Sequence, residues 1–484
     1  MTVLFSKPPR SSTPLVATDR AAFAAHAAAL EPAAQRWLHS VGFKGAPDTH
    51  ALLPSADGGI AAVWVGVHGA AHPWALAALP KTLPPGAYHL ARFMTNNLTD
   101  QLADLPNNDR DGATRLAGLE LDAAAAALSW ELGSYTFDLY KPARREPAQL
   151  HLPSNVHTQR ALIVAAAIAS TRDLVNTPAE HLGPAQLAQA VKLVAKQHGA
   201  TFKQTIGDKL LKGFPAIHAV GRAASADREP RLIELNWGNP KHPKISLVGK
   251  GVCFDSGGLD IKGADGMRLM KKDMGGAANA LGLAQMVMAL KLPVRLQLLI
   301  PAVENAISGN AYRPGDVFKT RKGLHIEIGN TDAEGRVILC DALAYAAESE
   351  PALLIDMATL TGAARVALGA QLPALFCRST DLARDLVDRS MDLHDPMWHM
   401  PLWHSYHGSI ESDIADIVNT GKTGLAGAVT AALFLADFVP AGQDWLHIDL
   451  FAWNNETRPG RPVGGEAQTL RTLLAYLEAR YVVM

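Results

Sequence analysis

The sequence predicts an α/β protein with a larger C-terminal domain, built on a mostly parallel and helix-covered sheet, and a smaller N-terminal α/β domain. Three observations support this fold class. The chain has 484 residues, which is too long for one comfortable hydrophobic core. In its second part, near-continuous apolar runs alternate with helical patterns. A stretch with three prolines and paired arginines separates the two parts.

The first part is rich in alanine, and its patterns predict a modest α/β unit. Two segments have the composition and apolar spacing of helices, and two short apolar segments are typical of strands. The helices are expected at residues 19–38 and 113–133, and the strands at 61–67 and 87–93. We expect no functional site here, because no cluster of titratable residues stands out.

The proline-rich stretch KPARREPAQLHLPS, residues 141–154, is expected to be a linker. A helix is predicted to follow it, from about Thr158 to Leu174. We therefore place the smaller N-terminal α/β domain at residues 1–155 and the larger C-terminal domain at residues 156–484.

The second part contains apolar runs typical of strands that are covered on both faces of a mostly parallel sheet. These runs are RLIELNW (231–237), KISLVGK (244–250), VRLQLLIPAV (294–303), ALLIDMA (352–358) and WLHIDLF (445–451). Helical patterns lie between them, at residues 276–290, 335–349, 382–393 and 426–438. This alternation predicts a doubly wound α/β domain.

The composition limits the classes of protein to which the chain can belong. Hydrophobic residues make up 48% and charged residues 19%, and the formal net charge is -1. That balance argues against nucleic acid or an anionic membrane as a main partner. Three cysteines without a CxxC motif indicate a reducing compartment. The N-terminus lacks the apolar core of a secretory signal, so we expect a cytoplasmic protein.

Charged residues follow several predicted strands, at the edge of the sheet where such folds bind ligands. Clustered carboxylates repel one another and do not all ionise unless a cation compensates them. A pair of divalent ions supplies that charge, clamps a nucleophilic water and polarises a carbonyl or phosphoryl oxygen. The side chains concerned are Lys250, Asp255, Lys262, Asp273, Asp332, Glu334 and Arg336.

The segment GNTDAEGR contains two of these acids. Asp332 and Glu334 are two apart in a segment that we expect to be extended, so their side chains should point the same way. Taken singly, the other residues have simpler explanations. Asp255 and Asp273 could cap helices, and Lys250 could be a solvated lysine. The residues alone therefore leave a metal or catalytic site and an ordinary charged surface both open.

Three longer motifs resemble the leucyl aminopeptidase (cytosol aminopeptidase) family. They are VGKGVCFDSGGLDIK (248–262), MKKDMGGAA (270–278) and NTDAEGR (330–336). Further matches lie in ENAISGNAYRPGD (304–316), DMATLTGA (356–363) and TGLAGAVTAALFL (423–435). The resemblance covers the second domain nearly end to end. It implies a metal-dependent exopeptidase, a hydrolase whose C-terminal domain binds metal and releases N-terminal residues from peptides.

The resemblance also implies roles for the charged residues. Two divalent ions would be bound, usually zinc with manganese or magnesium able to occupy one position, and a water between them would attack the scissile carbonyl. Asp255 and Glu334 would bridge the ions. Lys262 would stabilise the oxyanion, and Arg336 would hold a bicarbonate ion as the general base. The implied metal ligands are Lys250, Asp255, Asp273, Asp332 and Glu334.

The pocket for the substrate's N-terminal side chain is implied to lie beside the metal site. The chain departs from the family pattern after its last strand, where Phe451 and Trp453 replace smaller residues and Asn454 replaces a frequent methionine. These changes put a preference for leucine in doubt. The expected pocket residues are Met270, Thr359, Leu360, Gly362 and Phe451.

Other functions have less support from the sequence. The family implies peptide substrates with a free N-terminus and a homohexamer, but some bacterial relatives also bind DNA. A non-catalytic or dual-role DNA-binding regulator is therefore the alternative function. Hydrolysis of phosphate esters is a third hypothesis, but such sites favour histidine ligands and no histidine lies in the motifs. His447 and Asp449 on the last predicted strand are expected to be structural.

Overall fold

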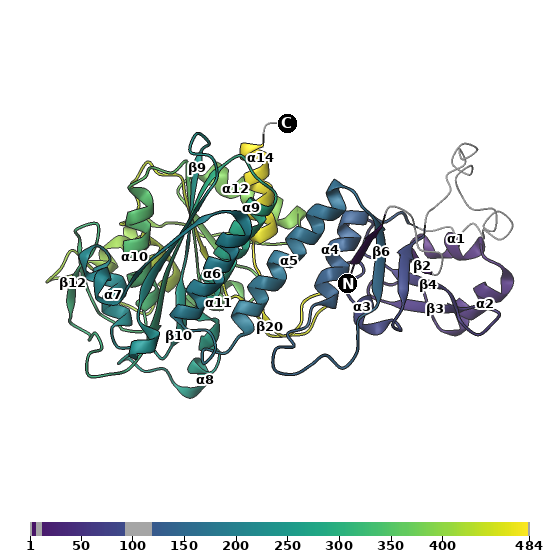
Figure 1. Ribbon diagram of the computed structural model, residues 1–484, viewed down its shortest axis with the longest axis horizontal. Helices are drawn as coiled ribbons and strands as arrows, with labels where there is room; N and C mark the ends of the chain where they lie inside the picture. Colours follow the sequence, from purple (N-terminus) through teal and green to yellow (C-terminus); the bar gives the residue numbers. More distant parts are fainter. Residues whose placement is uncertain (1, 6–11, 92–118, 483–484) are drawn as a thin grey trace. The chain divides into compact units, whose positions relative to one another are not determined.

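The computed structural model describes residues 2–5, 12–91 and 119–482 (Figure 1). They form two compact units. Unit 1 comprises Met1–Ala166 and Glu456–Pro462, and unit 2 comprises Ala167–Asn455 and Val463–Met484. The predicted boundary at residues 155 and 156 falls where helix α5 (Val156–Asn176) begins, whereas the units divide within that helix. The division of the chain into domains at residue 155 therefore stays a prediction.

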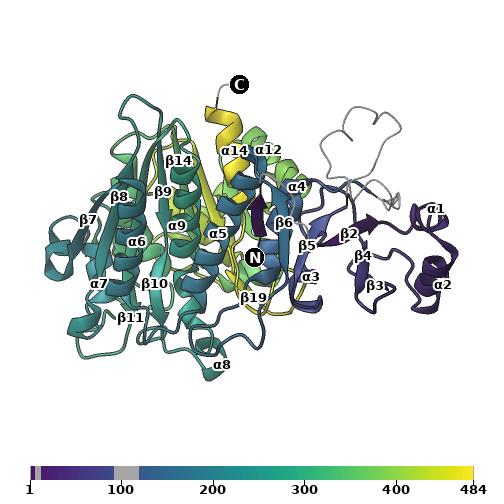
Figure 2. The same ribbon diagram turned by 45° about the vertical axis from the view of Figure 1, so that its right-hand side comes forward.

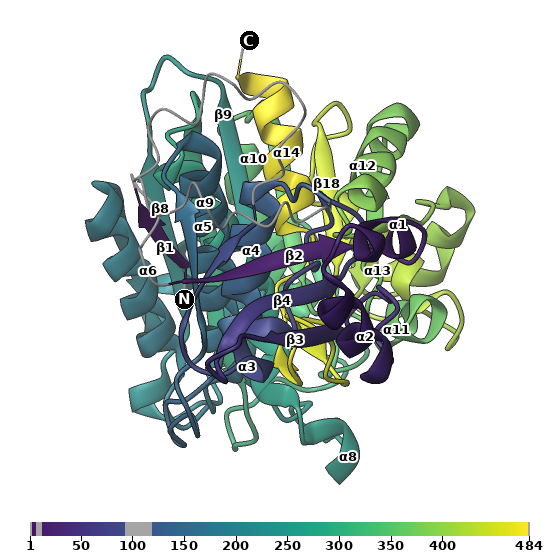
Figure 3. The same ribbon diagram turned by 90° about the vertical axis from the view of Figure 1, so that its right-hand side faces the viewer.

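Unit 1 has, in its described part, a six-stranded sheet with the order β1-β6-β5-β2-β4-β3. All neighbouring strands are parallel except β3 and β4, and Figure 3 shows β2, β4 and β3 side by side. The strands are β1 (Thr2–Phe5), β2 (Thr13–Thr18), β3 (His50–Pro54), β4 (Ile60–Gly66), β5 (Ala87–Leu90) and β6 (Gln149–Pro153). The helices are α1 (Phe23–Ala28), α2 (Pro32–Ser40), α3 (Leu79–Thr82) and α4 (Ala123–Ser134).

Two helix predictions in unit 1 need correction. Residues 19–38 form two helices rather than one. Pro32 opens α2 at its first turn, where a missing N–H does no harm, but it cannot continue a preceding helix. The second prediction, 113–133, begins too early. Asp122 caps α4 by accepting a hydrogen bond from the Ala125 N–H at 2.6 Å, and residues 113–118 lie outside the described residues.

The expected linker at residues 141–154 is wrong in its second half. Residues 149–153 form β6, which pairs with β1 and β5 inside the sheet. Leu150 and Leu152 are fully buried in the core of unit 1. This alternation of apolar residues has the period of a strand, but the flanking prolines obscured it.

Unit 2 contains the predicted doubly wound domain. Its described residues include a nine-stranded sheet with the order β16-β15-β18-β14-β9-β11-β8-β7, in which β10 also pairs with β11. The central pairs are parallel, and antiparallel pairs lie toward the edges. The strands are β7 (Thr201–Ile206), β8 (Arg231–Trp237), β9 (Lys244–Gly249), β10 (Gly251–Asp255), β11 (Arg295–Asn305), β14 (Leu353–Ala358), β15 (Ala374–Cys377), β16 (Trp398–His399) and β18 (Trp445–Asp449).

Helices cover both faces of this sheet. Gly249 of β9 faces α9, since a Cβ there would lie 2.6 Å from Ala277 Cα. Val248 points to the other face, where it joins a core that includes α7, α10 and α13. Figure 2 shows α6 and α9 on one side of the sheet. The helices are α6 (Pro184–His198), α7 (Pro215–Gly221), α9 (Gly275–Ala289), α10 (Glu334–Ala347), α12 (Thr380–Asp392), α13 (Gly427–Ala436) and α14 (Leu470–Tyr481).

All of the apolar runs that were predicted as strands in the second part form strands, with ends shifted by at most two residues. The four helical patterns between them correspond to α9, α10, α12 and α13. Among the described helices, none combines the length and the apolar character of a membrane span.

Candidate active site

The site begins where β9 passes into β10. Lys250 is the residue between these strands, which both pair in parallel with β11. Its backbone N–H donates to the Met357 carbonyl of β14 at 3.0 Å, and its carbonyl accepts from the Ala277 N–H of α9 at 2.8 Å. The sheet and the helix therefore fix the backbone from which the Lys250 side chain extends.

The Lys250 ammonium is buried among carboxylates. Its Nζ lies 2.7 Å from Asp273 Oδ2 and 2.9 Å from Glu334 Oε1, and it donates to the Thr359 carbonyl at 2.8 Å. Burial alone would lower the pKa of Lys250, but the two carboxylates outweigh burial and hold it above its usual value. Gly335 leaves room for this side chain, because a Cβ there would lie 2.6 Å from Lys250 Cε.

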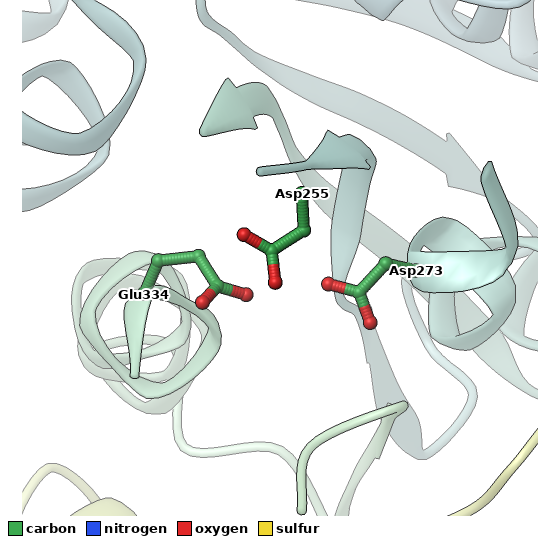
Figure 4. A group of neighbouring side chains, drawn as sticks. All are labelled: Asp255, Asp273 and Glu334. Atoms are coloured by element: carbon green, nitrogen blue, oxygen red, sulfur yellow. The ribbon is translucent and has the colours of Figure 1, made fainter. Parts of the chain in front are cut away.

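Three buried carboxylates converge at this point (Figure 4). Asp255 ends β10, Asp273 lies in the 3-10 helix η5 (Met270–Met274), and Glu334 opens α10. One oxygen of each lies within 4.8 Å of the others. Such a group is stable only with compensating positive charge.

Lys262 and Asp332 lie beside this group. Lys262 Nζ is 2.8 Å from Asp255 Oδ2 and also contacts Asp332 Oδ1. Burial alone would lower the pKa of Lys262, but Asp255 and Asp332 raise it above its usual value. Lys262 therefore keeps its proton at neutral pH. Burial, followed by repulsion from Asp255, raises the pKa of Asp332 to about 6.

The expected reason for Asp332 and Glu334 to face the same way is wrong. Residues 331–332 form a turn, and Glu334 is already the first residue of α10. Both side chains still line one cavity, because the turn and the helix start together take the place of the expected strand. Asp332 lies outside the three-carboxylate group and remains a third exposed.

Several carboxylate oxygens in the cluster are paired, among the described residues, only with a lysine ammonium. Asp273 Oδ2 and Glu334 Oε1 lie 2.7 and 2.9 Å from Lys250 Nζ, and Asp332 Oδ1 contacts Lys262 Nζ, but none of these contacts has the geometry of a good hydrogen bond. Burial, followed by repulsion from Asp255, raises the pKa of Glu334 to about 8. Buried oxygens of this kind are costly unless a cation or a donor satisfies them. Their chemistry fits hard divalent ions, which prefer oxygen ligands.

Arg336 differs from Lys262, the other predicted catalytic residue. It is buried in α10 and does not line the cavity. Burial lowers the pKa of Arg336 to about 10, although Glu334 and Asp449 act in the opposite direction. Its Nε is buried and has no hydrogen-bond partner among the described residues. A buried donor without an acceptor is an arrangement that an anion would complete.

The cavity has a volume of about 410 Å³. The Thr359 hydroxyl donates to Asp273 Oδ1 at 2.8 Å and so joins the pocket wall to the carboxylate group. Of the described residues after the last strand of the sheet, Phe451 lines the cavity, but Trp453 and Asn454 do not. The predicted residues that line it are Lys250, Asp255, Lys262, Asp273, Asp332, Glu334, Met270, Thr359, Leu360, Gly362 and Phe451.

Two cations in the lining, Lys272 and Arg365, were not predicted from the sequence. Burial lowers the pKa of Lys272 to about 8. One signal was available, because Arg365 is the only charged residue of GAARVALGA, an otherwise apolar segment. Asp449, expected to be structural, also lines the cavity. It accepts hydrogen bonds from the Thr361 N–H and hydroxyl, the latter at 2.6 Å.

Comparison with known proteins gives consistent matches. The family model described as "Cytosol aminopeptidase family, catalytic domain" matches residues 169–474, and the model "M17 aminopeptidase, N-terminal domain" matches residues 13–100. A "Probable cytosol aminopeptidase" from Syntrophotalea carbinolica is 41% identical over 387 residues, which are 75% of this chain and 76% of that protein.

Solved structures match over nearly the whole chain. The cytosol aminopeptidase from Coxiella burnetii is 46% identical with a TM-score of 0.90, and the match covers 99% of each chain. The bottromycin maturation enzyme BotP, solved in complex with Mn, is 32% identical with a TM-score of 0.81, and the match covers 97% of this chain and 99% of that one.

Proposed function

The chain belongs to the cytosol aminopeptidase family and is a metal-dependent aminopeptidase, and from this premise we propose which of its side chains bind the ions and which act on the peptide. The observation that carries the assignment is the group of buried carboxylates around Lys250. The alternative, a DNA-binding regulator, finds no support in these matches.

The ions would be two divalent cations, zinc or manganese. When bound, such ions polarise the scissile carbonyl and activate a water for attack on it. The buried oxygens of Asp273, Asp332 and Glu334, which only lysine ammonium groups compensate among the described residues, support this assignment, as does the manganese named with the BotP structure. The proposed ligands are Lys250, Asp255, Asp273, Asp332 and Glu334, with Asp255 and Glu334 shared between the ions.

Lys250 is the unusual member of this set. In the ion-free arrangement its ammonium compensates Asp273 and Glu334 at distances below 3 Å. Bound cations would take over that role, and their repulsion would favour the neutral amine, which offers a lone pair.

Lys262 would bind the carbonyl oxygen as negative charge develops on it. Its ammonium lies beside Asp255 at the cavity wall, and its raised pKa keeps it charged at neutral pH. Preorganised donors of this kind stabilise an oxyanion strongly in a water-poor site. Arg336 would hold a bicarbonate ion that accepts the proton of the attacking water, and its unsatisfied Nε supports an anion there.

The location and the assembly of the enzyme are also part of the proposal. The relatives named cytosol aminopeptidases and the three buried, unpaired cysteines support a cytoplasmic protein. We expect a homohexamer, by analogy with the family. Light scattering on the purified enzyme would measure its mass directly, and a monomeric mass would overturn this expectation.

The proposed ligand set can be tested with Asp332→Ala. The purified variant should lose activity toward aminoacyl amides and bind less zinc or manganese than the wild type, because a carboxylate is removed from the cluster. Asp392→Ala is the matched control, since Asp392 is exposed at the end of α12. Unchanged metal content in Asp332→Ala would show that the ligand assignment is wrong.

A further inference from the structure

We propose that the cavity selects peptides whose N-terminal residue is acidic, and that Lys272 and Arg365 bind the carboxylate of that side chain. The inference rests on the proposed function, because it requires the α-amine and the scissile carbonyl of the peptide to lie at the carboxylate cluster. The N-terminal side chain then lies against the adjacent wall, which includes Phe451 and Gly362.

The first observation is the buried ammonium of Lys272. Its side chain is 5% exposed, and it lines the cavity. No acceptor among the described residues lies within hydrogen-bond range of its Nζ, and the one carboxylate oxygen within 4.0 Å is Asp273 Oδ1 at 3.8 Å. That oxygen already accepts the Thr359 hydroxyl. A buried ammonium with three donors and no acceptor is incomplete without a ligand.

The second observation is the guanidinium of Arg365, which lines the same cavity from helix α11 (Gly362–Leu368). No carboxylate in the described part of the chain lies within ion-pair distance of it. Its Nη2 would lie 3.7 Å from a Cβ at Gly362, so the guanidinium covers a residue of the expected substrate pocket. An arginine at this position offers a fork of donors that matches a carboxylate.

Phe451 brings the two cations together. Lys272 Nζ lies 5.1 Å from the centre of its ring, and Arg365 Cζ lies 4.9 Å from the same centre. Cation–π contacts of this length hold both groups at the ring. Two like charges near one aromatic ring repel each other, and an anionic group bound in the same cavity would offset that repulsion.

The net charge of the cavity lining also favours an acidic side chain on the substrate. Its lining carries five acidic and four basic side chains, so two divalent ions would leave the loaded cavity positively charged. An apolar pocket for leucine gains nothing from these cations: the buried Lys272 would lose water without gaining an acceptor, and the exposed Arg365 would place a charge at its rim. A carboxylate on the substrate supplies the acceptors that the protein lacks.

Aminoacyl p-nitroanilides test the inference, because they have no free C-terminal carboxylate that could bind to the same cations. The metal-loaded enzyme would be assayed with Glu, Gln, Asp, Asn, Leu and Met derivatives. We expect kcat/KM for Glu to exceed that for Gln, or Asp that for Asn, by at least about tenfold, as is typical of a charged hydrogen-bonded pair. Free glutamate should likewise inhibit more strongly than free glutamine.

The variants Arg365→Gln and Lys272→Met should each remove most of this discrimination, measured as the ratio of kcat/KM for Glu to that for Gln. Arg384→Gln is the matched control, because Arg384 is exposed on α12 and its one ion pair within the described part of the chain is with Asp381. Metal content is measured for every variant. If Lys272→Met binds less metal than the wild type, the inference is judged on Arg365→Gln alone. Arg365→Glu should shift the preference toward basic N-terminal residues.

The outcomes separate this inference from the function on which it rests. Hydrolysis of Leu or Met derivatives without a preference for Glu over Gln or for Asp over Asn would overturn the inference and leave the aminopeptidase assignment intact. Discrimination that both variants retain would also overturn it. If the metal-loaded enzyme hydrolysed no member of the panel, the proposed function and the inference would fail together.

Discussion

The substitution Gly335→Ala probes the cluster without removing any charged group. Gly335 is the second residue of α10, and a Cβ there would lie 2.6 Å from Cε and 2.8 Å from Nζ of Lys250. An ordinary contact needs about 3.4 Å, so the Lys250 side chain would have to retreat by about 0.8 Å. Its contacts to Asp273, Glu334 and the Thr359 carbonyl are all shorter than 3 Å. A retreat of that size breaks at least one of them.

Two effects of opposite sign compete in this variant. Alanine is the better helix former, which would stabilise the protein by about 1 kcal/mol. Loss of one buried charge-assisted contact costs about 1.5–3 kcal/mol, and crowding adds to it. We therefore expect a net destabilisation of about 1–3 kcal/mol in urea unfolding. The displaced Lys250 should also reduce kcat/KM by about a hundredfold, which corresponds to about 3 kcal/mol.

Gly442→Ala is the control, because a Cβ there meets no atom within 4 Å. The assay combines urea unfolding with hydrolysis of an aminoacyl amide by the metal-loaded enzyme. A Gly335→Ala enzyme that is stabilised by about 1 kcal/mol and fully active would show that helix propensity decides here, and that the position of Lys250 does not matter.

Two further predictions concern pH and the buried support of the site. The folded-state pKa of Glu334, about 8, lies above its ordinary value of 4.5, so its contribution to stability is complete below about pH 4.5 and is lost as the pH rises through 8. The melting temperature of the metal-free protein should therefore fall between pH 5 and 8, and Glu334→Gln should make this fall smaller; a flat wild-type profile would contradict this. Asp356 accepts from Trp445 Nε1 at 2.7 Å and lies 2.6 Å from His447 Nδ1, with both ion-pair side chains fully buried. Asp356→Asn should cost about 2–4 kcal/mol in urea unfolding, and a loss below about 0.5 kcal/mol would refute a structural role.

The sequence was a good guide where one physical signal dominates. The apolar runs of unit 2 are buried on both faces, so their composition alone indicates strands. The predicted site residues other than Arg336 line one cavity, because the carboxyl ends of the parallel strands meet at one edge of the sheet. The motifs that resemble the aminopeptidase family lie at that edge, around Lys250 and Asp255.

Prediction failed where two signals conflict or where packing decides. The prolines beside β6 hid the alternation of Leu150 and Leu152. The turn at residues 331–332 brings Asp332 and Glu334 to one cavity without an extended strand. Lys272 and Arg365 are far apart in the sequence, but both lie near the ring of Phe451. Contacts of that kind depend on the tertiary fold and leave no periodic pattern.

The position of bound metal tests the central claim most directly. Crystals of the active enzyme grown with manganese should give two anomalous-scattering peaks per chain in the 410 Å³ cavity, both in contact with the oxygens of Asp255 and Glu334. Peaks located elsewhere in an active crystal, or an active enzyme with no ion at these carboxylates, would contradict the account.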